Sequence, residues 1–181
     1  MIKINMGCGW RNFGDDWIHI DGGDYDHLDH KDILNLPYED NMVDLIYASH
    51  VIEYFDTQEV QNVLKEWKRV LKKDGILRIA VPDFHSMTEL YHSGKIELIN
   101  ILGPLYGKMD MGDKKIYHKT VYDFKTLENT LKYAGFYDIF RYDWRNTNHS
   151  HFDDHSQAYI PHMDKQNGTL ISLNVECKNE F

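Results

Sequence analysis

The chain has 181 residues, with 20 Lys and Arg against 29 Asp and Glu, for a formal net charge of −9. This length fits one domain with its own core, and the negative charge argues against DNA or RNA as substrate, because phosphate binding needs clustered cations. Cys8 and Cys177 form no CxxC pair, which argues against a disulfide scaffold or a thiolate zinc site. No apolar run has membrane-spanning length and the first strand begins at Ile2, so we expect no signal peptide, no membrane insertion and a cytoplasmic location.

The N-terminus combines a glycine turn with an acid. A strand ending at Met6 runs into Gly7-Cys8-Gly9, and a second strand, residues 17–21, ends in Asp21. A Gly-x-Gly turn leaves backbone N–H groups open to a ligand. A carboxylate after the next strand can accept hydrogen bonds from both ribose hydroxyls of an adenosyl group. The layout predicts a nucleoside cofactor.

The glycine turn departs from the dinucleotide fingerprint. G-x-G-x-x-G needs a third glycine beneath the pyrophosphate, and this chain has Asn12 there. S-adenosylmethionine carries no phosphate and needs only the first two glycines. Residues 10–16 are also too few for a crossover helix, which usually takes about a dozen residues. We expect a one-turn helix or an extended loop, and a pocket open on the adenosine side that a second subunit of a homodimer can cover.

The rest of the chain alternates strand and helix patterns. Helix starts are expected where Asp56, Asp83 and Asp123 stand as caps, and Gly135 ends the last helix. The last two strands have no helix pattern between them and should pair antiparallel. Residues 1–181 thus predict one α/β domain with a mostly parallel seven-stranded sheet and an antiparallel last strand. The five strands expected after the first two are residues 28–32, 42–50, 76–81, 136–144 and 169–177.

Motif by motif, the chain resembles the class I S-adenosylmethionine-dependent methyltransferases, which have a Rossmann-like fold. In that family the glycine loop holds the methionine end of S-adenosylmethionine. The acid after the second strand binds the ribose, and the acid after the third strand binds the adenine. The family often has Leu-Glu-His after its fourth strand; this chain has Ile52-Glu53-Tyr54. The resemblance implies S-adenosyl-L-methionine as cofactor, S-adenosyl-L-homocysteine as product, and a cofactor site at Met6, Gly7, Cys8, Gly9, Asp21, Asp32, Ile33, Ala48, Ser49 and His50. The chain is similar to short predicted bacterial methyltransferases found among surface-polysaccharide genes.

Candidate general bases follow the strands, where open α/β sheets place their chemistry. His50 follows the fourth expected strand, and His118 precedes the last helix, where the related short methyltransferases also carry a His. Both are predicted catalytic residues, since imidazole titrates near neutral pH, although His50 can instead cap or pack. Asp83 can merely cap a helix, and His85 is expected to face solvent.

Residues 145–168, between the last two strands, are rich in His and Asp. They can form an acceptor-binding lid, a solvated or subunit-contact loop, or a metal site, but the spacing matches no metal motif and we predict no metal. In the lid interpretation, sugar hydroxyls or a phosphate ester are bound by Asp154, His155, Gln157 and Tyr159.

These patterns predict a methyltransferase that acts on a small polar acceptor. We expect O-methylation of a sugar, a nucleotide sugar or a phosphorylated surface-glycan precursor. The alternatives are a catalytically silent binding module and an N-methyltransferase of a small metabolite. A nicotinamide-dependent enzyme is disfavoured by Asn12.

Overall fold

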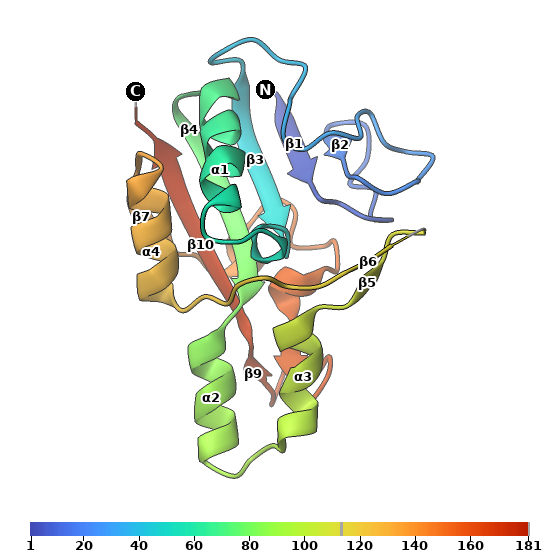
Figure 1. Cartoon of the computed structure of the whole chain (residues 1–181), viewed down its shortest axis with the longest axis vertical. Helices are drawn as coiled ribbons and strands as arrows, with labels where there is room; N and C mark the ends of the chain where they lie inside the picture. Colours follow the sequence, from blue (N-terminus) through green and yellow to red (C-terminus); the bar gives the residue numbers. More distant parts are fainter. Residues whose placement is uncertain (113, 181) are drawn as a thin grey trace.

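A six-stranded sheet forms the centre of the computed structural model, which describes residues 1–112 and 114–180. The strand order is β2-β1-β3-β4-β10-β7. β2, β1, β3 and β4 are mutually parallel, whereas β10 is antiparallel to both of its neighbours, β4 and β7. The predicted mostly parallel sheet with an antiparallel last strand is confirmed (Figure 1). The strands are β1 (Lys3–Met6), β2 (Ile18–Ile20), β3 (Val43–Ser49), β4 (Leu71–Pro82), β7 (Phe136–Arg141) and β10 (Ser172–Asn179).

The strand predicted at residues 28–32 is wrong, so the main sheet has six strands rather than seven. Only one parallel bridge remains there, between Ile20 and His30. The segment turns instead of extending because its acids bind nearby main chain. The Asp32 carboxylate accepts hydrogen bonds from the backbone N–H groups of Leu34 and Asn35, at 2.8 and 3.1 Å. Such Asx turns compete with ladder pairing.

One face of the sheet is covered by two helices, α1 (Glu59–Val70) and α4 (Phe124–Tyr133) (Figure 1). Asp123 caps α4 as predicted and accepts from the Thr126 N–H; α1 begins after Gln58, but Asp56 still accepts the Glu59 N–H at 2.8 Å and the Glu59 side chain accepts the Asp56 N–H. The buried side of α1 carries the periodic apolar residues Val60, Val63, Leu64, Trp67 and Val70. The chain enters β4 directly after Val70, so Lys72 and Lys73 belong to the strand and not to the last turn of the helix.

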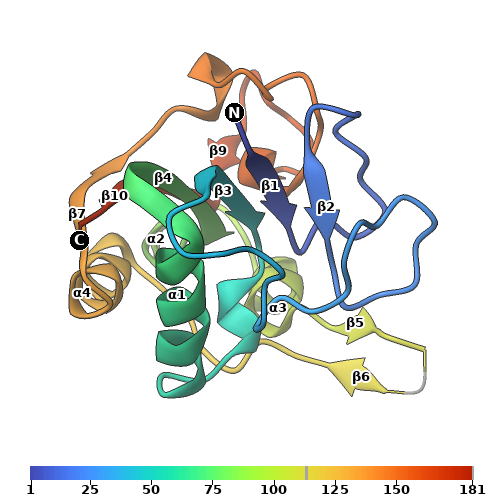
Figure 2. The same cartoon turned by 90° about the horizontal axis from the view of Figure 1, so that it is seen from above.

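The opposite face has no such helix. Leu45 and Tyr47 of β3 point to this side, and the short β1–β2 connection supplies Phe13 and Trp17 to the same cluster. Described residues 7–17 contain no helix, so of the two predicted forms, a one-turn helix or an extended loop, the connection is the loop. The cover is completed by residues 149–157, which lie across the sheet from α1 and α4 (Figure 2).

This covering segment, residues 149–157, contacts both the β1–β2 connection and the sheet. The ring of Phe152 stacks on Phe13 with centroids 4.3 Å apart. The buried Tyr47 hydroxyl donates to Asp154 Oδ2 at 2.6 Å. Part of the predicted lid loop is thus a layer of the core, replacing the helix that the short first crossover lacks.

The remaining elements stand beyond the carboxyl ends of the parallel strands. α2 (Phe84–His92) and α3 (Leu98–Tyr106) form a helical pair that extends from the body of the molecule (Figure 1). In the part of the chain that the structure describes, no helix is long and apolar enough to cross a membrane. The smaller elements are η1 (Ile52–Tyr54), β5 (Met109–Asp110), β6 (Lys115–Ile116), η2 (Trp144–Asn146), η3 (His155–Gln157), β8 (Tyr159–Ile160) and β9 (Thr169–Leu170).

Candidate active site

The glycine turn and the acid after β2 are in direct contact. Asp21 Oδ2 accepts the Gly9 N–H at 2.8 Å, and Oδ1 accepts the Gly23 N–H at 2.7 Å. Gly7 and Gly9 both have positive φ, +64° and +57°. A Cβ at Gly9 would meet nothing within 4 Å, so the turn is open above that residue. Each Asp21 oxygen keeps a further lone pair, which suits the ribose hydroxyls of an adenosyl group.

The carboxyl end of β3 lies beside the glycine turn, since Ala48 pairs with Met6 in the sheet. Met6 and Ala48 are fully buried and form a floor there. The Ser49 hydroxyl is buried and has no hydrogen-bond partner among the residues described. An unpartnered buried hydroxyl beside an open turn fits a polar ligand. The Cys8 thiol, with its pKa raised to about 12 by burial, stays protonated at neutral pH.

Asp32 and Ile33 lie apart from this arrangement. Besides the two backbone hydrogen bonds, the Asp32 carboxylate accepts from Asn35 Nδ2 at 2.9 Å, and the residue is exposed. The Ile33 carbonyl accepts from the Trp67 indole at 3.0 Å. The Asp32 side chain and the Ile33 main chain thus make local contacts, the Ile33 side chain packs against the core, and their adenine role stays a prediction.

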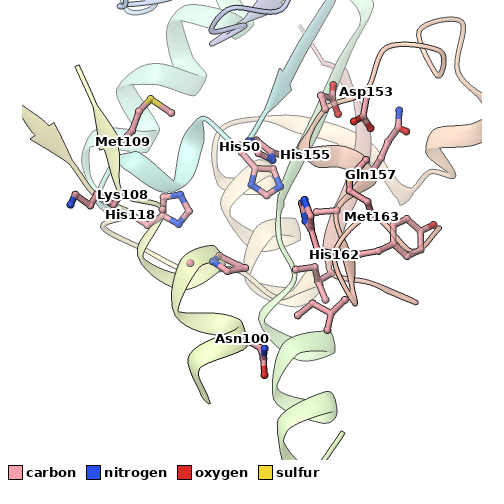
Figure 3. A pocket seen from close by; sticks show the side chains of 18 of the residues that line it. His50, Asn100, Lys108, Met109, His118, Asp153, His155, Gln157, His162 and Met163 are labelled. Atoms are coloured by element: carbon pink, nitrogen blue, oxygen red, sulfur yellow. The ribbon is translucent and has the colours of Figure 1, made fainter. Parts of the chain in front are cut away.

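A cavity of about 970 Å³ opens beyond the end of β3. It lies between Arg11 of the β1–β2 connection, the end of α3, the segment around His118, and residues 153–163 (Figure 3). Both predicted catalytic residues, His50 and His118, and all four predicted acceptor residues line it. Other polar lining residues are Arg11, Tyr54, Asn100, Lys108, Asp153 and His162.

Two of the lining histidines flank a buried acid. Glu53, in η1, is only 1% exposed, and its Oε1 lies 3.4 Å from His50 Nδ1 and 3.8 Å from His118 Nε2. His50 has φ +56°, an uncommon conformation for a residue with a side chain that often marks functional positions. Burial lowers the pKa of both histidines, so both rings are neutral bases at pH 7.

The four acceptor candidates differ in what their polar tips contact. Asp154 caps η3 and binds Tyr47; Gln157 Nε2 donates to the Ser150 and Phe152 carbonyls. The Tyr159 hydroxyl accepts from Arg145 Nη2 at 2.8 Å. His155 is exposed, and its ring lies 5.1 Å from that of His50. Of the four, only His155 lacks a hydrogen-bond partner for its side chain among the residues described.

Sequence reasoning missed Glu53 and Arg11. Glu53 lies within Ile52-Glu53-Tyr54, but a 3₁₀ turn of three residues has no periodicity to mark which side chain is buried. Arg11 lies in the short crossover, and its Nε donates to the Asp153 carbonyl at 3.0 Å, so it joins the glycine turn to the loop. No sequence signal links residues that far apart. No group of three or more His, Cys, Asp or Glu among the described residues is arranged to hold a metal ion.

Comparison with solved structures decides the fold. A methyltransferase from Archaeoglobus fulgidus, described as S-adenosylmethionine dependent, superimposes with a TM-score of 0.58 over 97% of this chain and 85% of its own, at 15% identity. The fold is that of a class I methyltransferase. The 1,6-didemethyltoxoflavin-N1-methyltransferase of Burkholderia thailandensis, solved with S-adenosylhomocysteine bound, has a TM-score of 0.57 over 99% of this chain and 71% of its own, at 11% identity.

Sequence comparison points the same way. The family described as Methyltransferase domain matches residues 20–79, which include Asp21 and His50 but not the glycine turn. A demethylmenaquinone methyltransferase of Staphylococcus haemolyticus is 28% identical over 125 residues, 62% of this chain; the match spans about half (48%) of that relative. Together the comparisons show a methyltransferase fold and a partial sequence match to methyltransferases.

Proposed function

We propose that this chain is a methyltransferase that transfers the methyl group of S-adenosylmethionine to a small polar acceptor in the 970 Å³ cavity. The observation that carries the proposal is the contact between Gly9 and Asp21, just after the carboxyl ends of β1 and β2. When bound, the cofactor supplies a methyl group activated by a sulfonium. Asp21 binds the ribose, and Ser49 is available to a polar group of the cofactor's methionine end.

The cavity residues position the acceptor, because in-line methyl transfer depends mainly on orientation and electrostatics. His50 or His118 removes the acceptor's proton, since both rings are neutral and border the cavity. We propose that the four candidates of residues 145–168 contribute to the acceptor site, with His155 in direct contact and Asp154, Gln157 and Tyr159 shaping the wall.

For the acceptor we propose a hydroxyl of a sugar, a nucleotide sugar or a phosphorylated precursor of a surface glycan. Arg11, Lys108 and four histidines line the cavity, and such donors suit hydroxyl and phosphate oxygens. Transfer to nitrogen is the second candidate, because a structural neighbour is described as an N1-methyltransferase. A cytoplasmic location, a homodimer and the absence of nucleic-acid binding remain predictions from the sequence.

Calorimetry with S-adenosylhomocysteine tests the cofactor site. Asp21→Asn removes the charge that accepts the ribose hydroxyls, and charge-assisted hydrogen bonds are each worth roughly 1.5–3 kcal/mol, so the affinity should fall about 10- to 100-fold. Asp26→Asn, an exposed acid in the same loop, is the matched control and should bind as wild type does. A wild-type protein that ignores the compound at millimolar concentration refutes the proposal. Bound S-adenosylhomocysteine without methylation of any sugar, phosphosugar or amine acceptor favours the silent module.

A further inference from the structure

Glu53 is a buried acid with no hydrogen bond to its carboxyl group. Both carboxyl oxygens lack a hydrogen-bond partner among the described residues. The main chain beneath is fixed, because the Glu53 carbonyl accepts the N–H groups of Lys119 and Thr120 at 2.8 and 3.3 Å. An unpartnered buried carboxyl is costly and persists in native proteins mainly where it has a function.

Four titratable side chains lie near this acid. His50 comes from the end of β3 and His118 from the segment before α4, and both approach the same oxygen, Oε1. The phenols of Tyr54 and Tyr122 are the other titratable neighbours, and the charge of Glu53 helps to raise the pKa of each. No Lys or Arg side chain forms an ion pair with Glu53 in the described part of the chain. A fixed countercharge is therefore absent there.

The Glu53 side chain is more deeply buried than the His50 side chain beside it. The Glu53 side chain is 1% exposed and does not line the cavity, whereas the His50 side chain is 13% exposed and does. His50 presents Nδ1 to Glu53, and its other ring nitrogen, Nε2, lies 3.4 Å from the Ser172 hydroxyl. The His50 ring therefore stands between the buried acid and an acceptor in the cavity. In Figure 3, His50 lies beside His155, and His118 stands at the other side of the cavity.

We propose that Glu53 is a positioning residue that orients His50 and His118 and exchanges one proton with them, so that its ionised form stabilises the imidazolium formed during methyl transfer. This step rests on the proposed function. The acceptor O–H gives its proton to His50 Nε2 as the new carbon–oxygen bond forms and the carbon–sulfur bond breaks. The resulting imidazolium directs its Nδ1–H at the Glu53 carboxylate, and the proton later leaves to solvent.

The charge state of Glu53 fixes the expected pH dependence. Burial raises its pKa to about 8, while burial lowers the pKa of both histidines. At pH 7 the group is therefore mostly neutral acid and neutral imidazoles. The carboxylate that stabilises the imidazolium forms as the pH rises through about 8, so methyl transfer should increase across that range.

NMR titration of the histidine rings in the ligand-free protein tests this proposal. In wild type, the ring signals of His50 and His118 should shift with a midpoint near pH 8, because ionisation of Glu53 changes the field at both rings. Glu53→Gln should abolish that step. The matched control is Glu89→Gln, which removes an exposed acid 3.5 Å from His85 and should leave the step intact. No step near pH 8 in wild type, or the same step in Glu53→Gln, overturns the proposal.

Two further measurements keep the test decisive. If Glu53→Gln fails to fold, a carboxyl-carbon titration of wild type alone should show one glutamate that ionises near pH 8; its absence overturns the proposal. Once an acceptor is identified, the alkaline rise of kcat should disappear in Glu53→Gln and persist in Glu89→Gln. The titrations use no cofactor. They therefore test the coupling between Glu53 and the histidines even if the protein proves not to be a methyltransferase.

Discussion

The contact of Gly7 with Val51 predicts a large difference between two otherwise similar substitutions. A Cβ at Gly7 would lie 2.3 Å from Val51 Cγ2, and Val51 is buried and β-branched, so it cannot move aside. A left-handed alanine costs roughly 1 kcal/mol and overpacking adds about 2 kcal/mol. Gly7→Ala should therefore destabilise the fold by about 3 kcal/mol, or roughly 6–12 °C in Tm for a chain of this size.

Gly9→Ala is the matched comparison. It has the same sign of φ but no atom within 4 Å of the new Cβ, so only the backbone cost of about 1 kcal/mol, or roughly 2–4 °C, is expected. Its methyl group enters the open space where we propose the cofactor binds. The loss in binding free energy for S-adenosylhomocysteine should therefore exceed the loss in the free energy of unfolding.

Thermal unfolding and a double-mutant cycle with Val51→Ala measure the steric part. Removing both Val51 γ-carbons should recover most of the overpacking, giving a coupling energy of about 2 kcal/mol between the two sites. Equal Tm losses in Gly7→Ala and Gly9→Ala, or no coupling to Val51, would refute the reasoning.

The remaining predictions concern stability. Phe152→Ala removes the ring that stacks on Phe13, and urea denaturation should show a loss of about 2 kcal/mol. His149 is buried beside Arg78, and its pKa is lowered to about 3, so the unfolded chain gains a proton before the folded one does. Stability should be full above pH 6.5 and fall by about 2 kcal/mol between pH 6.5 and 5; a slope equally steep in His149→Gln contradicts this. The raised pKa of Glu53 has the opposite effect. Its contribution to the free energy of unfolding is fully present below pH 4.5 and is lost as the pH rises toward 8. Glu53→Gln should therefore unfold at higher urea than wild type at pH 8, and a lower midpoint there counts against the assigned burial effect.

Local patterns were sufficient for much of the fold. The apolar period of α1, the caps at Asp56 and Asp123 and the near-continuous apolar run of β3 each depend on neighbours close in sequence. The strand expected at residues 28–32 failed for the same local reason, because Asp32 binds its own following backbone and turns the chain.

Only those site residues that belong to the family's sequence pattern could be predicted from the sequence. That pattern brought the glycine turn and Asp21 together, and the structure places them in contact. It gave no indication that Glu53 is buried between two histidines, nor that Asp154 would bind Tyr47 across the sheet. Both contacts depend on tertiary packing between distant segments, which a single sequence does not display.

The covering segment, residues 149–157, both stabilises the fold and borders the proposed acceptor cavity. Phe152 and Asp154 anchor it on the sheet, and His155 from the same few residues borders the cavity. Replacing the whole loop, residues 145–168, to change the acceptor would also remove the residues that cover one face of the sheet. Residues 161–163 border the same cavity and are exposed, so a directed-evolution library confined to them can vary selectivity while the protein still folds.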